Sequence, residues 1–107
     1  NYRILQKARR ALDTARDQDG KLFNIVELPM PRPISYEGQR VPATYVNFYF
    51  ANSSLLVPTF GQRDRDRRAI AVLQKHLPKR KVFGVDCREL IWGLGAIHCF
   101  TQQQPRF

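Results

Sequence analysis

TYVNFYFA, residues 44–51, and SLLVPTF, residues 54–60, decide the fold class of this chain. Both segments are rich in β-branched and aromatic residues, and only Asn52 and Ser53 separate them, so they predict a β-hairpin. Alternation along the first segment divides its side chains between two faces, Val46, Phe48 and Phe50 on one and Tyr45, Asn47 and Tyr49 on the other. The second of these faces is amphipathic.

A helix and further strands are predicted after the hairpin. Gly61 opens a charged stretch, residues 62–68, which leads into a helix with an apolar stripe of Ala69, Ile70, Leu73 and Leu77. Pro78 ends that helix because proline cannot continue it. Three elements are expected to follow: a short strand over Lys81–Val85, a tight turn or short helix over Cys87–Ile91, and a final strand over Ala96–Gln102.

The residues before the hairpin predict one helix, one strand and a long loop. Apolar residues recur at three- and four-residue spacing over Tyr2–Asp17, which predicts a helix. Leu22–Leu28 reads as a strand, and the proline-rich segment Pro29–Ala43 as a loop of the length that is often functional. The order of elements indicates a mixed α/β fold. Because the first helix begins without a cap, we expect this chain to be a piece of a longer protein.

Composition narrows the class of protein. The chain has 107 residues, of which 43% are hydrophobic and 11% aromatic, too large a share for a disordered basic tail. No apolar run approaches the roughly 20 residues that cross a bilayer, and the first residues lack the apolar core of a secretory signal. We therefore expect a soluble cytoplasmic domain, with no membrane partner and with Cys87 and Cys99 as reduced thiols.

The charge pattern is basic but dispersed. There are 18 Lys and Arg against 9 Asp and Glu, and aspartates alternate with arginines in residues 63–68. A solvated face explains this pattern as well as a nucleic-acid partner does, and no recognised nucleic-acid motif accompanies it. The candidate metal ligands also lack the paired spacing of a zinc site, so neither a metal nor a cofactor is expected. These ligands are His76, Cys87, His98 and Cys99.

GLGAIHCFTQQQP, residues 93–105, is the most informative segment for function. Gly93 and Gly95 allow a ligand to approach the backbone closely, and they lead directly to a thiol at Cys99. On a strand, His98 would point away from Cys99, so a base that deprotonates the thiol would have to come from elsewhere. From the residues alone, Cys99 is either a nucleophile or a buried structural thiol.

Three separated segments resemble the agmatine deiminases and the related bacterial peptidylarginine deiminases. Residues 93–105 resemble the C-terminal signature of that family, and PATYVNFYFAN (42–52) followed by VPTFG (57–61) resembles an internal one. LPMP, residues 28–31, is similar as well. The resemblance runs through nearly all of the chain in the same order, and it favours Cys99 as a nucleophile.

This resemblance implies an α/β fold that is a portion of a five-bladed α/β-propeller of the guanidine-modifying type, built from ββαβ units. Residues 1–107 would be the C-terminal portion of a single catalytic domain. The implied reaction is hydrolysis of agmatine to N-carbamoylputrescine and ammonia, in putrescine and polyamine biosynthesis, through a covalent intermediate on Cys99. The carboxylates and the acid/base His of the family lie mainly upstream, so we expect this chain to be inactive alone.

The resemblance also implies roles for other residues. Asn47 corresponds to a family asparagine that lines the substrate pocket, and Gly93 and Gly95 belong to the turn beside the substrate. His98 matches the residue before the nucleophile. The implied partner is a small guanidino molecule, with no nucleic acid, and a homo-oligomer is left open.

Two residues depart from the family pattern, and two other functions stay open. The turn before Ile-His-Cys is usually Gly-Gly-Gly-Asn in the family, whereas Leu94 here adds a bulky side chain and Ala96 deletes an amide. One alternative is a deiminase of protein or peptidyl arginine, in which residues 29–43 control access. The other is a non-catalytic basic binding module that keeps the fold without the chemistry.

Overall fold

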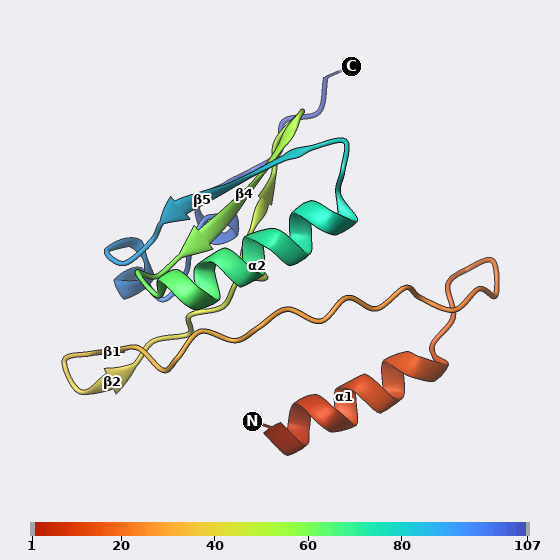
Figure 1. The fold of residues 1–107 in the computed structure, drawn as a ribbon, viewed down its shortest axis with the longest axis horizontal. Coiled ribbons are helices and arrows are strands. Elements are labelled where there is room, and N and C mark those ends of the chain that lie inside the picture. Colours follow the sequence, from red (N-terminus) through yellow and green to blue (C-terminus); the bar gives the residue numbers. More distant parts are fainter. Residues whose placement is uncertain (1, 107) are drawn as a thin grey trace.

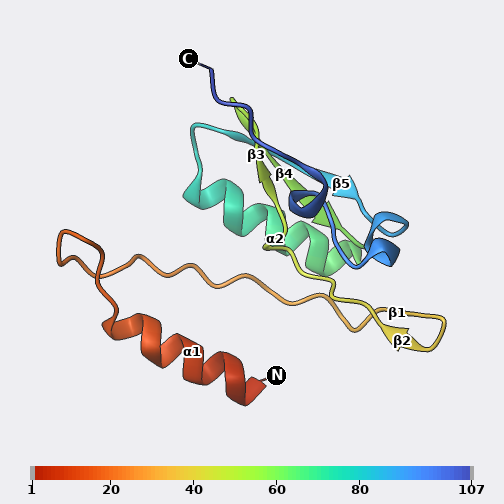
Figure 2. The same cartoon turned by 180° about the vertical axis from the view of Figure 1, so that it is seen from behind.

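A computed structural model describes residues 2–106 of the chain. Its centre is a sheet with the strand order β3-β4-β5, formed by β3 (Tyr49–Phe50), β4 (Ser54–Thr59) and β5 (Lys81–Asp86). Helix α2 (Arg63–His76) covers one face of this sheet, and the residues that follow β5 cross the other face (Figures 1 and 2). The α/β class expected from the sequence is confirmed.

Strand β4 is the middle of the sheet. It pairs antiparallel with β3, with Tyr49 opposite Leu56, and parallel with β5, from Ser54 opposite Lys81 to Thr59 opposite Asp86. Two parallel strands cannot be joined by a tight turn, and α2 supplies the crossover between them. Leu55 and Val57 of β4 are fully buried.

Helix α2 packs on the sheet through the stripe that the sequence predicts. Ala69 and Leu73 are buried, with Ile70 partly buried beside them. A Cβ at position 84 of β5 would lie 2.9 Å from both Ile70 Cδ1 and Thr59 Cγ2. A glycine there therefore lets the helix approach the strand closely.

The N-terminal part of the chain lies apart from this centre. Helix α1 (Tyr2–Thr14) has no buried residue, and an extended arm, residues 15–34, runs back beside it (Figure 1). The Arg9 guanidinium pairs with Asp13 on the helix and with Glu27 on the arm. Among residues 2–106, no helix is long and apolar enough to span a membrane.

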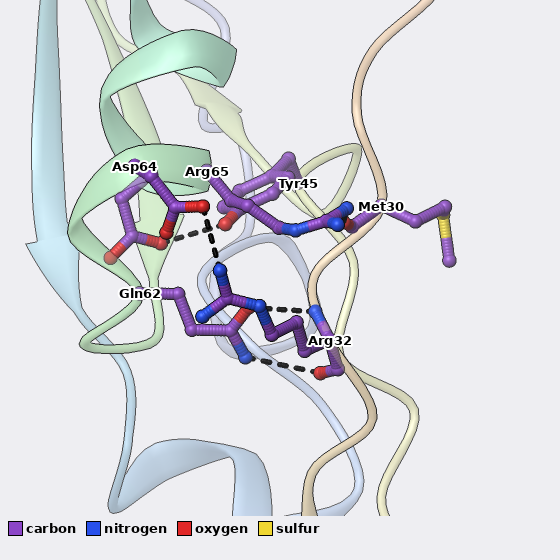
Figure 3. A network of polar contacts seen from close by, with 7 residues as sticks. Met30, Arg32, Tyr45, Gln62, Asp64 and Arg65 are labelled. Atoms are coloured by element: carbon purple, nitrogen blue, oxygen red, sulfur yellow. Dashed lines mark hydrogen bonds and ion pairs between the residues drawn. The ribbon is translucent and has the colours of Figure 1, made fainter.

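The arm leads to a small hairpin and is tied to α2 just before it. The hairpin consists of β1 (Ser35–Tyr36) and β2 (Gln39–Arg40). The Gln62 amide accepts the backbone N–H of Arg32 at 2.7 Å and donates to its carbonyl at 3.0 Å, while the Arg32 guanidinium donates to Asp64 at 2.8 Å (Figure 3). Arg65 donates to the carbonyl of Met30 at 2.7 Å. These bonds fix where the arm crosses the helix.

Several predicted elements agree with the structure. The first helix forms, although it ends at Thr14 instead of near Asp17, and the pairing of β3 with β4 confirms the hairpin. The later helix and the strand that follows it are α2 and β5.

Four predictions were wrong in whole or in part. Residues 22–28 do not form a strand, and apart from a single bridge between Arg16 and Leu22 they have no strand to pair with. Residues 44–48 lie outside β3, because Tyr45 and Val46 form a turn. Residues 96–102 contain a 3-10 helix, η2 (His98–Phe100), instead of a strand. The predicted loop over residues 29–43 contains the β1–β2 hairpin.

Candidate active site

The segment after β5 folds into a compact turn that presents the Cys99 thiol. It comprises the 3-10 helix η1 (Leu90–Gly93), the connecting residues 94–97 and the 3-10 helix η2. Ile91, Ala96 and Ile97 are buried and anchor the turn, whereas Cys99 is exposed. Burial of these apolar neighbours holds the turn against the sheet and leaves the sulfur accessible.

Asn47, which lies two residues before β3, is hydrogen-bonded to this turn. Its Nδ2 donates to Cys99 Sγ at 3.0 Å, although the two residues are 52 positions apart. Its Oδ1 accepts the backbone N–H of Cys99 at 3.4 Å, and its carbonyl oxygen accepts the backbone N–H of His98 at 3.2 Å. One asparagine therefore holds both the main chain and the sulfur of the turn that carries Cys99.

The environment of the thiol favours its deprotonated form. The hydrogen bond from the Asn47 side chain lowers the pKa of Cys99, and the backbone N–H of Ala96 lowers it further. Donors that point at sulfur stabilise the negative charge of a thiolate. Burial has the opposite effect on the other thiol and raises the pKa of Cys87. Of the two cysteines, Cys99 is the one suited to nucleophilic attack.

The two glycines of the turn differ in how tightly they are packed. A Cβ at position 95 would lie 2.7 Å from the Cβ of Cys99 and 3.1 Å from its sulfur. A Cβ at position 93 would lie 3.3 Å from Cζ of Phe100. Gly95 is therefore required for the turn to close on Cys99, and Gly93 contacts a more exposed ring.

The two departures from the family pattern lie on opposite sides of Gly95. Leu94 adopts a left-handed conformation, with φ of +63°, and its side chain is 69% exposed. Glycine is the residue that tolerates this region of backbone space without strain. Ala96 is fully buried, and its contribution to the thiol comes from its backbone N–H.

The hairpin β1–β2 reaches the same region. The Tyr36 ring stacks on Trp92 of η1, with 4.3 Å between ring centroids and an interplanar angle of 13°. The segment 29–43, which would control access if the substrate were peptidyl arginine, thus touches the turn that precedes Cys99.

The predicted site residues can now be located. Asn47, Gly95 and Cys99 lie together, Gly93 lies beside Phe100, and His98 contributes a backbone N–H. The argument that His98 points away from Cys99 assumed a strand, which the structure replaces with η2. The sequence marked Ala96 only as a departure from the family pattern, and it gave no sign of the backbone N–H that Ala96 directs at the thiol, because a backbone donor carries no side-chain signal.

One acidic residue close to the turn in sequence is already paired with a cation. The carboxylate of Asp86 accepts the Arg88 guanidinium at 2.6 Å, and this contact lowers the pKa of Asp86. No group of three or more His, Cys, Asp or Glu residues within the described range could hold a metal ion. A groove of about 510 Å³ is lined by α1, the arm and residues 44–46, and Cys99 is not among its lining residues.

Comparison with known proteins identifies close relatives. Residues 1–105 match the profile of the family described as Porphyromonas-type peptidyl-arginine deiminase. An agmatine deiminase from Pseudomonas fluorescens is 35% identical over 98% of this chain and 33% of its own length.

Solved structures agree in fold. A protein from Porphyromonas gingivalis, provisionally assigned as an arginine deiminase, superposes with a TM-score of 0.89 at 38% identity, covering 95% of this chain and 30% of that one. The agmatine deiminase of C. jejuni superposes with a TM-score of 0.77 at 39% identity, covering 89% of this chain and 28% of that one. A second structure of the C. jejuni enzyme, in which serine replaces a cysteine, holds substrate. The chain therefore spans about a third of the length of these relatives.

Proposed function

This chain belongs to the Porphyromonas-type peptidyl-arginine deiminase family, and from that premise we propose that it supplies the nucleophile of a hydrolase that acts on the guanidinium of agmatine. The observation that carries the proposal is the exposed Cys99 thiol, whose sulfur accepts a hydrogen bond from Asn47. That contact lowers the pKa of Cys99, so more of the reactive thiolate is present near neutral pH.

The chemistry follows from the thiolate. Cys99 Sγ attacks the central guanidinium carbon and forms a carbon–sulfur bond, and the resulting tetrahedral centre expels one nitrogen as ammonia after that nitrogen is protonated. Water then attacks the same carbon, a base takes a proton from it, and the carbon–sulfur bond breaks. The products are N-carbamoylputrescine, ammonia and the regenerated thiolate. Asn47 holds the sulfur for the first step.

The rest of the machinery is proposed to lie in the longer protein. A planar guanidinium requires carboxylates that accept its N–H groups, and both half-reactions require a proton shuttle such as His. Within the described residues Cys99 is exposed. We therefore assign residues 1–107 to the C-terminal portion of one catalytic domain, a five-bladed α/β-propeller in the cytoplasm, that is inactive when this portion is expressed alone.

Gly93 and Gly95 are proposed to let the substrate approach the backbone of the turn. Of the two, Gly95 has the stronger packing constraint, because any side chain there would collide with Cys99. No cofactor is needed for this hydrolysis, since the thiolate and water supply both nucleophiles. In a cell that makes agmatine, the product would enter putrescine and polyamine biosynthesis.

The direct test is an assay for ureido product on the full-length protein with agmatine. Product from the wild type that is lost in Cys99→Ala supports both the reaction and the nucleophile. Retention of turnover in Cys99→Ala would show that the assigned nucleophile is wrong. The isolated 107 residues should give no turnover, and measurable activity would contradict the proposed division of the site.

Peptidyl arginine is the second candidate substrate. The family description and the P. gingivalis relative both point to arginine deimination, and the Tyr36–Trp92 stack brings the β1–β2 hairpin to the turn beside Cys99. The full-length protein should be assayed in parallel with agmatine and with a peptide that ends in arginine. A higher kcat/KM for the peptide than for agmatine would make peptidyl arginine the assigned substrate.

A binding module without catalysis is the third candidate, and Leu94 and Ala96 are the observations that favour it. A haloacetamidine, which mimics a guanidinium and alkylates thiols, separates the two classes. If the site is catalytic, Cys99 should react much faster than the buried Cys87 in the full-length protein. Equal rates at the two cysteines would favour the binding module.

A further inference from the structure

Asn47 lies in a segment that the sheet does not fix. Strand β3 begins at Tyr49, and residues 45 and 46 form a turn, so the main chain around Asn47 lacks the ladder of hydrogen bonds that a strand provides. The contacts of Asn47 described above all go to His98 and Cys99 in the turn that carries the thiol. Another contact must hold this segment against the rest of the fold if Asn47 is to hold Cys99.

Tyr45 provides that contact. Tyr45 is 1% exposed, and its hydroxyl donates to Oδ1 of Asp66 on α2 at 2.8 Å. Its ring also packs against Phe60 with 5.6 Å between centroids. Tyr45 precedes Asn47 by two residues, so fixing the tyrosine limits the freedom of the asparagine.

Asp66 is itself held in place. It is 8% exposed, and its Oδ1 accepts the backbone N–H of Phe60 at 3.1 Å in addition to the Tyr45 hydroxyl. A buried carboxylate is costly unless donors surround it, and here two donors converge on one oxygen. Burial, together with the hydrogen bond to Asp66, raises the pKa of Tyr45, so the phenol remains a donor over the physiological range.

We propose that Tyr45 and Asp66 are positioning residues for the nucleophile, which they place through Asn47. This inference rests on the proposed function of Cys99. The connection runs from Asp66 on α2 to Tyr45, from there along the backbone to Asn47, and from the Asn47 amide to the sulfur. Loss of the first bond loosens the last one, and the thiolate then loses its strongest side-chain donor.

The test is the pH dependence of alkylation at each cysteine. The full-length protein is treated with iodoacetamide for set times at a series of pH values, and peptide mapping measures how much of each cysteine has reacted. Tyr45→Phe removes one hydroxyl and keeps the ring. The midpoint for Cys99 should move up toward the ordinary thiol value of about 8.5, and alkylation near pH 7 should become slower than in the wild type. Turnover of agmatine should fall in kcat while KM changes little.

Two matched variants make the result specific. Tyr49→Phe makes the same chemical change two residues after Asn47, in β3, where Tyr49 lies opposite Leu56 and it is Tyr45 that bonds to Asp66. Its Cys99 profile should therefore match the wild type. Asp66→Asn keeps an acceptor oxygen for the Tyr45 hydroxyl and should restore most of the Cys99 reactivity that Asp66→Ala loses. Protection of the buried Cys87 reports whether each variant is folded.

The outcomes separate this inference from the proposed function. If Cys99 of the wild type titrates at or above the ordinary value, the nucleophile assignment itself fails. If the wild-type midpoint is low and folded Tyr45→Phe or Asp66→Ala has the same midpoint, the positioning role is overturned and the nucleophile assignment stands. Should Tyr45→Phe lose the protection of Cys87, the comparison of Asp66→Ala with Asp66→Asn decides the question.

Discussion

Replacement of Gly95 by alanine should disable the site while leaving the fold in place. The added methyl carbon would lie 2.7 Å from the Cβ of Cys99 and 3.1 Å from its sulfur. Carbon atoms pack at about 3.5–4.0 Å, so the turn must open by roughly 1 Å to accept the methyl group. The exposed Cys99 can move outward to do so, because it faces solvent.

The size of the effect follows from that displacement. A misplacement of about 1 Å at a reacting group can cost on the order of a hundredfold in rate. We therefore expect kcat/KM of the full-length protein for agmatine to fall about a hundredfold in Gly95→Ala. Displacing Sγ also breaks its contact with Asn47, so the pKa of Cys99 should rise and alkylation near neutral pH should slow.

Two other glycines serve as controls. At Gly84 an added Cβ would meet Ile70 and Thr59 at 2.9 Å, away from the thiol, so Gly84→Ala should destabilise the fold by about 1–3 kcal/mol through overpacking and leave Cys99 alkylation unchanged. At Gly93 the neighbour is the exposed ring of Phe100, which can turn aside, and Gly93→Ala should have a smaller effect on rate than Gly95→Ala.

The assay combines turnover, timed alkylation and thermal unfolding for the three variants of the full-length protein. We expect a rate defect without a large stability loss in Gly95→Ala, and the reverse pattern in Gly84→Ala. Wild-type turnover in folded Gly95→Ala would refute the claim that close packing of position 95 against Cys99 sets the geometry of the nucleophile.

Three further predictions concern neighbouring residues. Because the Asn47 amide lowers the pKa of Cys99, Asn47→Ala should shift the pH profile of Cys99 alkylation to higher pH, and an unchanged profile would remove Asn47 from the site. Leu94→Gly relieves a positive φ and should stabilise the fold by about 1 kcal/mol, read as a higher Tm; a lower Tm would mean that the Leu94 side chain contributes packing that outweighs the strain. Tyr36→Ala removes the stack on Trp92 and should expose the β1–β2 hairpin to faster trypsin cleavage after Arg40, whereas cleavage at the wild-type rate would show that the stack does not hold the hairpin.

Local patterns in the sequence were sufficient for the elements at the centre of the fold. The apolar stripe of Ala69 and Leu73 and the proline at position 78 define α2, and the strand residues of 54–59 and 81–86 form β4 and β5 where they were expected. These elements bury side chains at the period of their own secondary structure, so the pattern is readable without a partner.

The predicted elements that did not form depend on partner segments that the sequence does not specify. Residues 22–28 and 96–102 both have strand-like composition, yet apart from the single bridge at Leu22 neither has a strand beside it, and strand structure requires hydrogen bonds to a second segment. Tyr45 and Asn47 were expected to share a strand face, but the turn at residues 45 and 46 interrupts the alternation on which that expectation depends.

The sequence by itself determined the α/β class through local composition, and its contiguous motifs carried the resemblance that pointed to the family and to Cys99 as the proposed nucleophile. Only the tertiary structure decided which groups surround the sulfur. The Asn47 donor comes from 52 residues away, and the anchor from Asp66 to Tyr45 joins a helix to a turn. Such contacts arise when packing brings distant segments within hydrogen-bond distance, and no pattern along the chain encodes that distance.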